Sequence, residues 1–526
     1  MFRSNCKSQP AFAYLYREFM EHEDYGKILW RVVSEMTEAP YWHRVWISQE
    51  IALSSSVVFW SGDFYLTTKE LFIIRWVFLS NPDRHNSILG QYANQEQIIK
   101  ATTHLGRVMI VLASLRDSHS AEYQQSRRYL QATIDKGRES YSTDLRDKVY
   151  GLLALLPQQI ALQIKPSYEE TWTWQDTWTD FSRICIEYEQ RLDIIGACTN
   201  PQGGASNLPS WAFDLTPPRP RIEGTEHSTE ASGNSLEGLV SFSPARSRRI
   251  ESFADQGLEA PFHFSDNGRI LRCVGILIDT VGILATESDR AMPIFEQQTD
   301  TSSPVCFETT KLSLARVMMG NSKYQFSDGP SILDVPYLDR NQIQLQVIHD
   351  EFERMKWDPE LILRTKDFHV FMSKWVERTI SEAGGKRVPW KACFLSTGFF
   401  NSWHEEIVPF QGFMIGGRPL RDYFDSQDEF CQDWRQFQFS MLGFGGAMRG
   451  RRLFTTEKGR LGSITKRAIC GDRVAVLSGC NVPVVLRPKG DGYELVGSCF
   501  VDGLMNGESQ GILERNQAVL EDIAIY

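Results

Sequence analysis

The stretch GDRVAVLSGCNVPVVLRPKGDGYELVGSCFV, residues 471–501, decides the fold class. Three runs rich in β-branched and apolar residues are separated by Gly, Asn, Asp, Lys and Pro, which is the pattern of short strands joined by turns. Asp491-Gly492 predicts a tight hairpin between the second and third runs. Extending outward, residues 451–508 repeat the same texture, so we predict a compact, mainly antiparallel β unit there, either a small sheet or a partly closed barrel.

Upstream of this unit, the apolar residues recur at helical spacing. STDLRDKVYGLLALLP, residues 142–157, predicts a helix with Asp144 as N-cap, Asp147 as its capping partner and a stop at Pro157. TWTWQDTWTDFSRICIEYEQ, residues 171–190, predicts a second amphipathic helix with Trp174, Trp178, Phe181 and Cys185 on one side. The fold class is therefore mixed α+β, with a helical middle and a C-terminal antiparallel β unit.

Composition narrows the function classes. The 526 residues carry a formal net charge of −10, which argues against nonspecific nucleic-acid binding. No apolar run reaches the roughly 18 residues of a membrane span, and the N-terminus lacks the apolar core of a secretory signal. The ten cysteines form no C-x-x-C pair, so a reduced, cytoplasmic setting is expected.

Motifs for cofactors and metals are incomplete. WHEEI, residues 403–407, begins like a zinc-protease helix, but Val408 stands where the second His is required. GFGGAMRG, residues 443–450, has neither dinucleotide-binding nor P-loop spacing and is followed by a β-like segment. We therefore expect no cofactor and no metal.

One carboxylate is a weak catalytic candidate. In YWHRVWISQE, residues 41–50, Arg44 and Glu50 flank an aromatic block. Glu50 could be an acid–base or ribose-binding carboxylate positioned by Arg44, or it could hold a helix end. We also expect Trp46 to be largely buried, so that Trp46→Ala would destabilise the protein by about 3–5 kcal/mol.

Two other clusters of charged residues could likewise be either functional or structural. Asp144, Arg146 and Asp147 could form a charged site, or a cap with a local ion pair. The Gly-Asp pair at 471–472 and the Gly-Glu pair at 507–508 could look catalytic, although turn geometry accounts for them equally well.

In combination, these segments resemble the fungal heterokaryon-incompatibility (HET) family. Residues 41–62 resemble the closing segment of the HET domain, with its R-V-W-x-x-Q-E signature, and residues 142–157 and LPSWAFDL, residues 208–215, resemble segments that follow that domain. Residues 451–508 resemble the family's C-terminal block. The positions that carry the resemblance are Arg44, Val45, Trp46, Gln49, Glu50, Asp144, Arg146, Asp147, Lys148, Tyr150, Gly471, Asp472, Arg487, Gly503, Gly507 and Glu508.

The resemblance implies an organisation and a role. Two upstream HET segments, A-L-S-Y-x-W-G-like and W-I-D-x-x-C-I-N-Q-like, have no counterpart here, so the expected architecture begins with a partial α/β HET-domain remnant. The regions are 1–75 (end of a HET domain), 76–215 (helical), 216–262 (linker or disordered insertion), 263–450 (mixed α/β) and 451–526 (β module).

The family implies non-self recognition and programmed cell death. The chain would act through contacts with other proteins, including HET relatives, with an inactive remnant as one possibility. The alternative is an NAD-type nucleotide hydrolase with Glu50 at its site, which rests on a distant likeness of the HET domain to Toll/interleukin-receptor domains.

Overall fold

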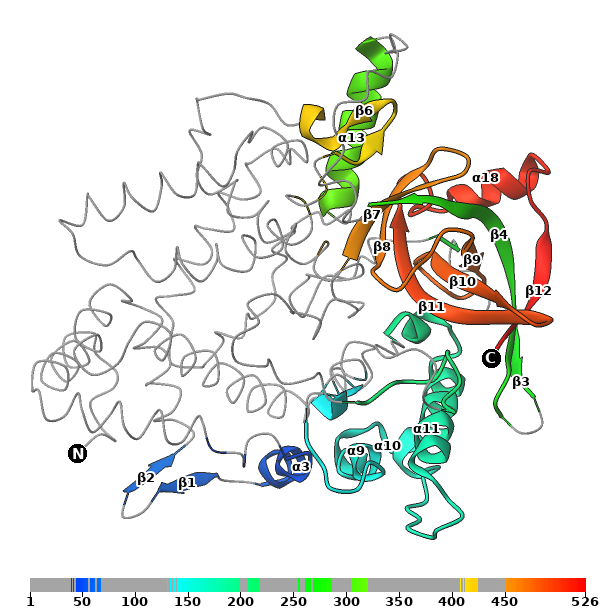
Figure 1. Cartoon of the computed structure of the whole chain (residues 1–526). Helices are drawn as coiled ribbons and strands as arrows, with labels where there is room; N and C mark the ends of the chain where they lie inside the picture. The colour runs from blue at the N-terminus through cyan, green and yellow to red at the C-terminus, as the bar shows by residue number, and fades with distance from the viewer. Residues whose placement is uncertain are drawn as a thin grey trace, which may run out of the picture.

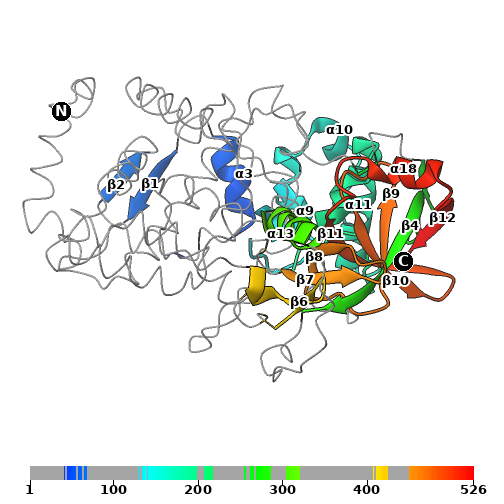
Figure 2. The same cartoon turned by 90° about the horizontal axis from the view of Figure 1, so that it is seen from above.

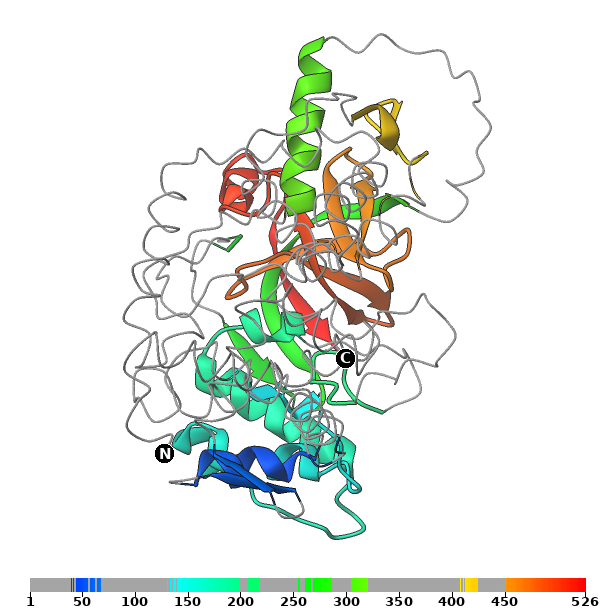
Figure 3. The same cartoon turned by 90° about the vertical axis from the view of Figure 1, so that its left-hand side faces the viewer.

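A computed structural model of the chain describes mainly residues 44–67, 130–197, 207–216, 254–255, 261–285, 304–319, 412–423 and 451–526, with short gaps and a few single residues between them. In Figure 3 these parts follow one another from α3 at the bottom, through a helical layer and a barrel, to α13 at the top. Most of the predicted linker, residues 216–262, and much of the predicted mixed α/β region, residues 263–450, lie outside the described residues.

The predicted strands of the C-terminal unit are confirmed. They are β7 (Arg451–Thr456), β8 (Leu461–Thr465), β9 (Arg473–Leu477), β10 (Val484–Lys489) and β11 (Gly492–Val501). The pairs β7–β8, β9–β10 and β10–β11 are antiparallel, and Lys489 pairs with Gly492 across the expected hairpin. β-Branched and apolar side chains favour this extended backbone, and glycines occupy the turns.

One strand from far upstream closes the sheet into a barrel. β4 (Leu271–Leu284) pairs with β9 on one side and with β7 on the other, and β8 pairs with β11. The pairings β4–β7–β8–β11–β10–β9–β4 therefore return to their starting strand. β4 can serve both neighbours because its register shifts near Leu277 and again near Val281, and such bulges bend and twist a strand.

Two shorter strands extend this barrel. β12 (Leu520–Ile525) runs antiparallel to the first half of β4 and meets β11 at Tyr493, and β3 (Phe262–Phe264) pairs with β4 on its other edge. A short helix, α18 (Glu508–Glu514), lies between β11 and β12 and packs Ile512 into a buried cluster with barrel residues. Figure 1 shows α18 beside the barrel.

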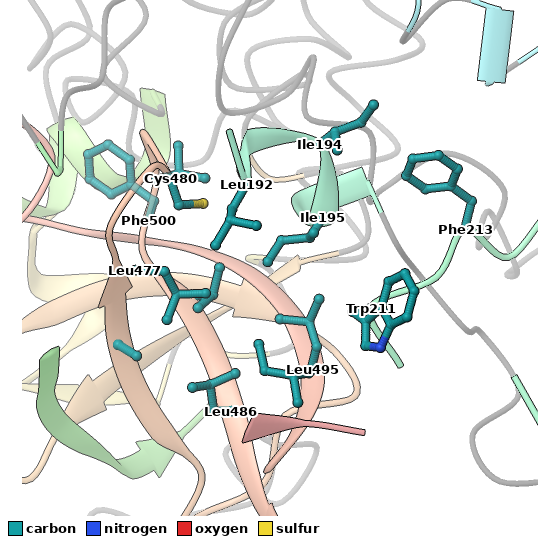
Figure 4. Packing of buried hydrophobic residues seen from close by; sticks show 14 of the residues in the cluster. Leu192, Ile194, Ile195, Trp211, Phe213, Leu477, Cys480, Leu486, Leu495 and Phe500 are labelled. Carbon is teal, nitrogen blue, oxygen red and sulfur yellow. The ribbon is translucent and has the colours of Figure 1, made fainter. Parts of the chain in front are cut away.

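The strand residues are buried on both faces of the sheet, and they alternate between two clusters. Val474 and Val476 join a cluster to which all six ring strands contribute, which identifies the barrel interior. Ala475 and Leu477 join a second cluster that includes the helical layer. Figure 4 shows the contact between barrel and helical layer, and its labelled residues are Leu192, Ile194, Ile195, Trp211, Phe213, Leu477, Cys480, Leu486, Leu495 and Phe500.

The helical layer holds one of the two predicted helices as expected. α11 (Trp174–Glu189) begins with a capping box formed by Thr173 and Asp176, and it buries Trp178, Phe181 and Cys185. The predicted helix after Asp144 is wrong as a continuous element. It is broken into α9 (Asp147–Tyr150), η2 (Leu153–Leu155) and, beyond Pro157, α10 (Gln158–Ala161), and the N-cap of α9 is Arg146.

The remaining described elements surround this framework. α3 (Trp46–Ala52) precedes the hairpin of β1 (Val58–Ser61) and β2 (Phe64–Thr67), and η3 (Asp193–Ala197) follows α11. α13 (Pro304–Met319) packs on β8, near the β5–β6 hairpin (Met414–Ile415 and Arg418–Pro419) and η7 (Leu420–Tyr423). Figure 2 shows β1, β2 and α3 on the side of the molecule opposite β12. Within the described ranges, no helix has the length and apolar character that a membrane crossing requires.

Candidate functional site

Two segments about one hundred residues apart meet at α3. The Val45 N–H donates to the Tyr141 carbonyl at 3.1 Å, and Arg44 forms an isolated parallel bridge with Tyr141. One turn into the helix, Gln49 Nε2 donates to the Tyr150 carbonyl at 3.0 Å. The Arg44–Glu50 segment and the Asp144–Tyr150 segment, which resemble HET-family motifs, are thus joined into one structural unit. We call this unit the signature junction.

Asp147 is the polar centre of the signature junction. Its Oδ2 accepts a hydrogen bond from Trp46 Nε1 at 3.4 Å, and its Oδ1 accepts one from the Tyr168 hydroxyl at 2.6 Å. Desolvation and the bond to Asp147 raise the pKa of Tyr168. The carboxylate therefore holds α3 and the loop that follows α10 to the start of α9.

Arg146 ties the same loop down from the other side. Its guanidinium binds both carboxylate oxygens of Asp144, with the shortest contact at 2.7 Å, and lies 5.1 Å from the centre of the Tyr168 ring. It also donates to the carbonyls of Glu169 and Trp172 at 3.1 and 3.0 Å. The hydrogen bond from Arg146 lowers the pKa of Asp144. The predicted local ion pair is therefore present, and it organises a loop rather than a helix cap.

Lys148 is the buried cation of the junction. Its side chain is 0% exposed, and Nζ donates to the carbonyls of Gly137 at 3.0 Å, Arg138 at 3.3 Å and Ser140. Burial lowers its pKa to about 8. These contacts are with backbone oxygens inside the protein, so the ammonium group serves the fold and is not presented to a ligand.

Glu50, the catalytic candidate, lies at the exposed edge of the junction. Its Oε2 accepts a hydrogen bond from the Tyr41 hydroxyl at 3.2 Å, and desolvation together with the Glu50 charge raises the pKa of that tyrosine. Most of the Trp46 surface is covered, as expected, and the side chain packs against the main apolar cluster, while its neighbours Val45 and Ile47 are 0% and 3% exposed. The most deeply buried apolar residues of this segment are therefore Val45 and Ile47.

In the barrel, Gly471, Asp472 and Arg487 form a second group. Asp472 is 1% exposed; it accepts two hydrogen bonds from Arg487, at 2.9 and 3.0 Å, and one from the Ile469 N–H at 2.9 Å. Gly471 has φ +94°, a backbone conformation that favours glycine. The group closes the β8–β9 connection against the end of β10.

Gly503, Gly507 and Glu508 lie where β11 turns into α18. Gly507 has φ +86° and is the N-cap of that helix, and Glu508 accepts a hydrogen bond from the Asn506 N–H at 2.7 Å. Residues 507–511 read GESQG, which matches the G-x-S-x-G spacing of serine hydrolases. Ser509, however, is buried and donates its hydroxyl hydrogen to the Ala254 carbonyl at 2.5 Å, so it acts as a structural contact.

The sequence reasoning missed a polar network between the barrel and the helical layer. Arg191 binds Asp193 at 2.9 Å, Asp255 at 3.0 Å and Asn481 Oδ1 at 2.9 Å. Asp255 also accepts from the Gly479 N–H at 3.0 Å. Asp255 falls within the segment expected to be a linker, and its Ser- and Pro-rich surroundings gave no signal for a buried carboxylate.

The chemistry open to these groups is limited by their contacts. Across the ranges that the structure covers, no cluster of three or more His, Cys, Asp or Glu side chains could hold a metal ion. The charged side chains of the junction and of the barrel group bind other groups of the chain: Asp147, Lys148, Asp472 and Arg487. The signature junction is therefore suited to fixing α3 and the loop after α10 in position.

Comparisons with known proteins point to one family. The Het-6 beta-barrel domain matches residues 436–520, which include β7–β11 and α18. "Heterokaryon incompatibility protein 6, OR allele" of Neurospora crassa is 40% identical over 77 residues, which are 14% of this chain and 11% of that protein. No solved structure matches. The resemblance inferred for the C-terminal block, residues 451–508, is thus confirmed.

Proposed function

We propose that this chain, which matches the Het-6 β-barrel domain over residues 436–520, is a heterokaryon-incompatibility protein of fungi and acts in non-self recognition. It works in the cytoplasm through contacts with other proteins, including HET relatives, and feeds into programmed cell death. Its own contribution is binding rather than chemistry.

The main support for this proposal is that the polar side chains of the motifs bind groups of the chain itself. Four motif side chains form hydrogen bonds within the chain: Trp46, Gln49, Asp147 and Lys148. A catalytic group needs reach to a substrate and an environment that tunes its pKa. A motif whose members bind one another instead supports a rigid scaffold that presents surfaces.

The nucleotide-hydrolase alternative ranks second. It depends on Glu50, which is exposed at the end of the short helix α3 and contacts the Tyr41 hydroxyl. A carboxylate in water keeps its hydration shell and gains little as an acid–base group. The geometry therefore favours binding.

A forced heterokaryon tests the proposal. One strain of a filamentous fungus expresses this chain, its fusion partner expresses the Neurospora protein, and a vital dye reports dead hyphal compartments. We expect more death than with an empty vector, no killing when the chain is expressed alone, and the same result with Glu50→Gln. Asp472→Ala, checked for protein level, should weaken the response.

Two outcomes would count against this function. Fused strains that grow like the vector control would remove the role in incompatibility. Death that disappears with Glu50→Gln, together with NAD consumption by the purified chain, would make the hydrolase the better account.

A further inference from the structure

An exposed aromatic and acidic surface adjoins the signature junction. Tyr168 and Trp172 are 53% and 36% exposed, and Glu169 and Glu170 between them are also exposed. All four lie in the loop between α10 and α11, which projects at the bottom of Figure 1 away from the barrel. We call residues 168–172 the acidic aromatic loop.

The loop is held rigidly although it is exposed. The Tyr150 hydroxyl bonds both the carbonyl and the N–H of Ser167, at 3.2 and 3.1 Å, and Trp172 Nε1 donates to Thr177 Oγ1 at 2.9 Å. Arg146 binds two of the loop's carbonyls, as described above. Exposed aromatics on a preorganised backbone lose little conformational entropy when they bind, which is the character of interface anchors.

The surface also shows which partner chemistry fits it. Arg146 already lies against the ring of Tyr168 at 5.1 Å, while more than half of the tyrosine stays open to solvent. Glu169 and Glu170, which follow the tyrosine directly in the sequence, are exposed, and Asp147 accepts a hydrogen bond from the tyrosine hydroxyl. Aromatic faces beside carboxylates suit a guanidinium, which can stack and form paired hydrogen bonds at once.

We propose that the acidic aromatic loop is the docking surface for an arginine-bearing segment of a partner protein. The inference rests on the proposed function, because it names the partner chemistry of the contact role. An arginine side chain stacks on Tyr168 or Trp172, and its neighbours pair with Glu169 and Glu170.

Peptide binding to the purified full chain tests the inference. The probes are fluorescein-labelled nonaarginine, nonalysine and nonaglutamate, followed by anisotropy at several salt concentrations. The double variant Glu169→Gln/Glu170→Gln removes the charges, Tyr168→Ala removes the ring, and Tyr168→Phe restores it. The matched control, Glu521→Gln/Asp522→Asn, removes two exposed carboxylates from β12.

We expect nonaarginine to bind more tightly than nonalysine. The double variant should weaken its binding about fivefold and Tyr168→Ala about threefold, while Tyr168→Phe and the β12 control stay within about twofold of wild type. Equal loss in the β12 control, equal binding of both cationic peptides, or no binding by the wild type would overturn the inference. Since the peptide assay does not depend on cell death, it separates failure of this surface from failure of the proposed function.

Discussion

Replacing Lys148 with methionine should change how stability depends on pH. In the folded protein, burial against three backbone carbonyls lowers the lysine pKa from 10.5 to about 8. In the unfolded chain the side chain is hydrated and regains its ordinary pKa. Between about pH 8 and 10.5, unfolding therefore takes up a proton, and the free energy of unfolding rises with pH.

The size of the effect follows from the two pKa values. The rise approaches about 1.4 kcal/mol per pH unit and totals about 3 kcal/mol over the whole interval. The methionine side chain of the variant cannot titrate, so the wild-type value minus the variant value should increase by about 2 kcal/mol between pH 7.5 and 10. Cysteine and tyrosine ionisation affects both proteins alike and cancels in this difference.

Urea unfolding followed by circular dichroism at half-unit pH steps measures this difference. Lys165→Met, at an exposed lysine of the loop after α10, is the control and should differ little from wild type at any pH. If the difference between wild type and Lys148→Met stays constant from pH 7.5 to 10, the ammonium group is not desolvated as the structure indicates.

Three further changes probe the barrel and its contact with the helical layer, each by thermal and urea unfolding. Asp472→Ala leaves Arg487 without its buried carboxylate and should lower the free energy of unfolding by about 2–3 kcal/mol. This is less than for a wholly buried ion pair, because Arg487 is 28% exposed. Gly462→Ala places a methyl group 2.3 Å from the Phe500 carbonyl oxygen and should cost about 3 kcal/mol or more. Trp178→Ala empties a site that is 0% exposed and should cost about 3–5 kcal/mol.

Controls for these variants lie at exposed positions. Glu521→Ala on β12 and Gly459→Ala, whose added methyl meets nothing within 4 Å, match the charge and glycine changes. Gly459 has φ +82°, so its variant reports the cost of backbone strain alone. Barrel variants that unfold no more easily than these controls would show that the named contacts are weak.

Local signals in the sequence predicted the parts of the fold that depend on neighbouring residues. The strands of 451–501 follow from short apolar runs separated by turn residues, and the helix at 174–189 follows from apolar residues at helical spacing. The prediction of one helix after Asp144 failed because the sequence pattern did not reveal two breaks. After Tyr150 the backbone hydrogen bonds change from α-helical to 3₁₀ spacing, and after Leu155 the backbone becomes extended at Leu156.

The parts that could not be predicted depend on long-range pairing. Neither the return of β4 to the barrel nor the burial of Asp255 has a local signature, since each is fixed by residues about 200 positions away. At the site, the sequence did not reveal which groups the candidate residues contact. The sequence suggested Arg44 as the group that positions Glu50, yet the structure gives Glu50 the hydroxyl of Tyr41.

The closed barrel has a consequence for the timing of synthesis. β4 ends at Leu284, but the last strand that covers its apolar residues ends at Ile525, roughly 240 residues later. At about 5–20 residues per second, a ribosome needs roughly 10–50 s to supply that strand. During this interval the alternating Val, Ile and Leu residues of β4 form an open strand edge, which can pair with other chains. The nascent chain should therefore need a chaperone that holds residues 271–284 until the C-terminus leaves the ribosome.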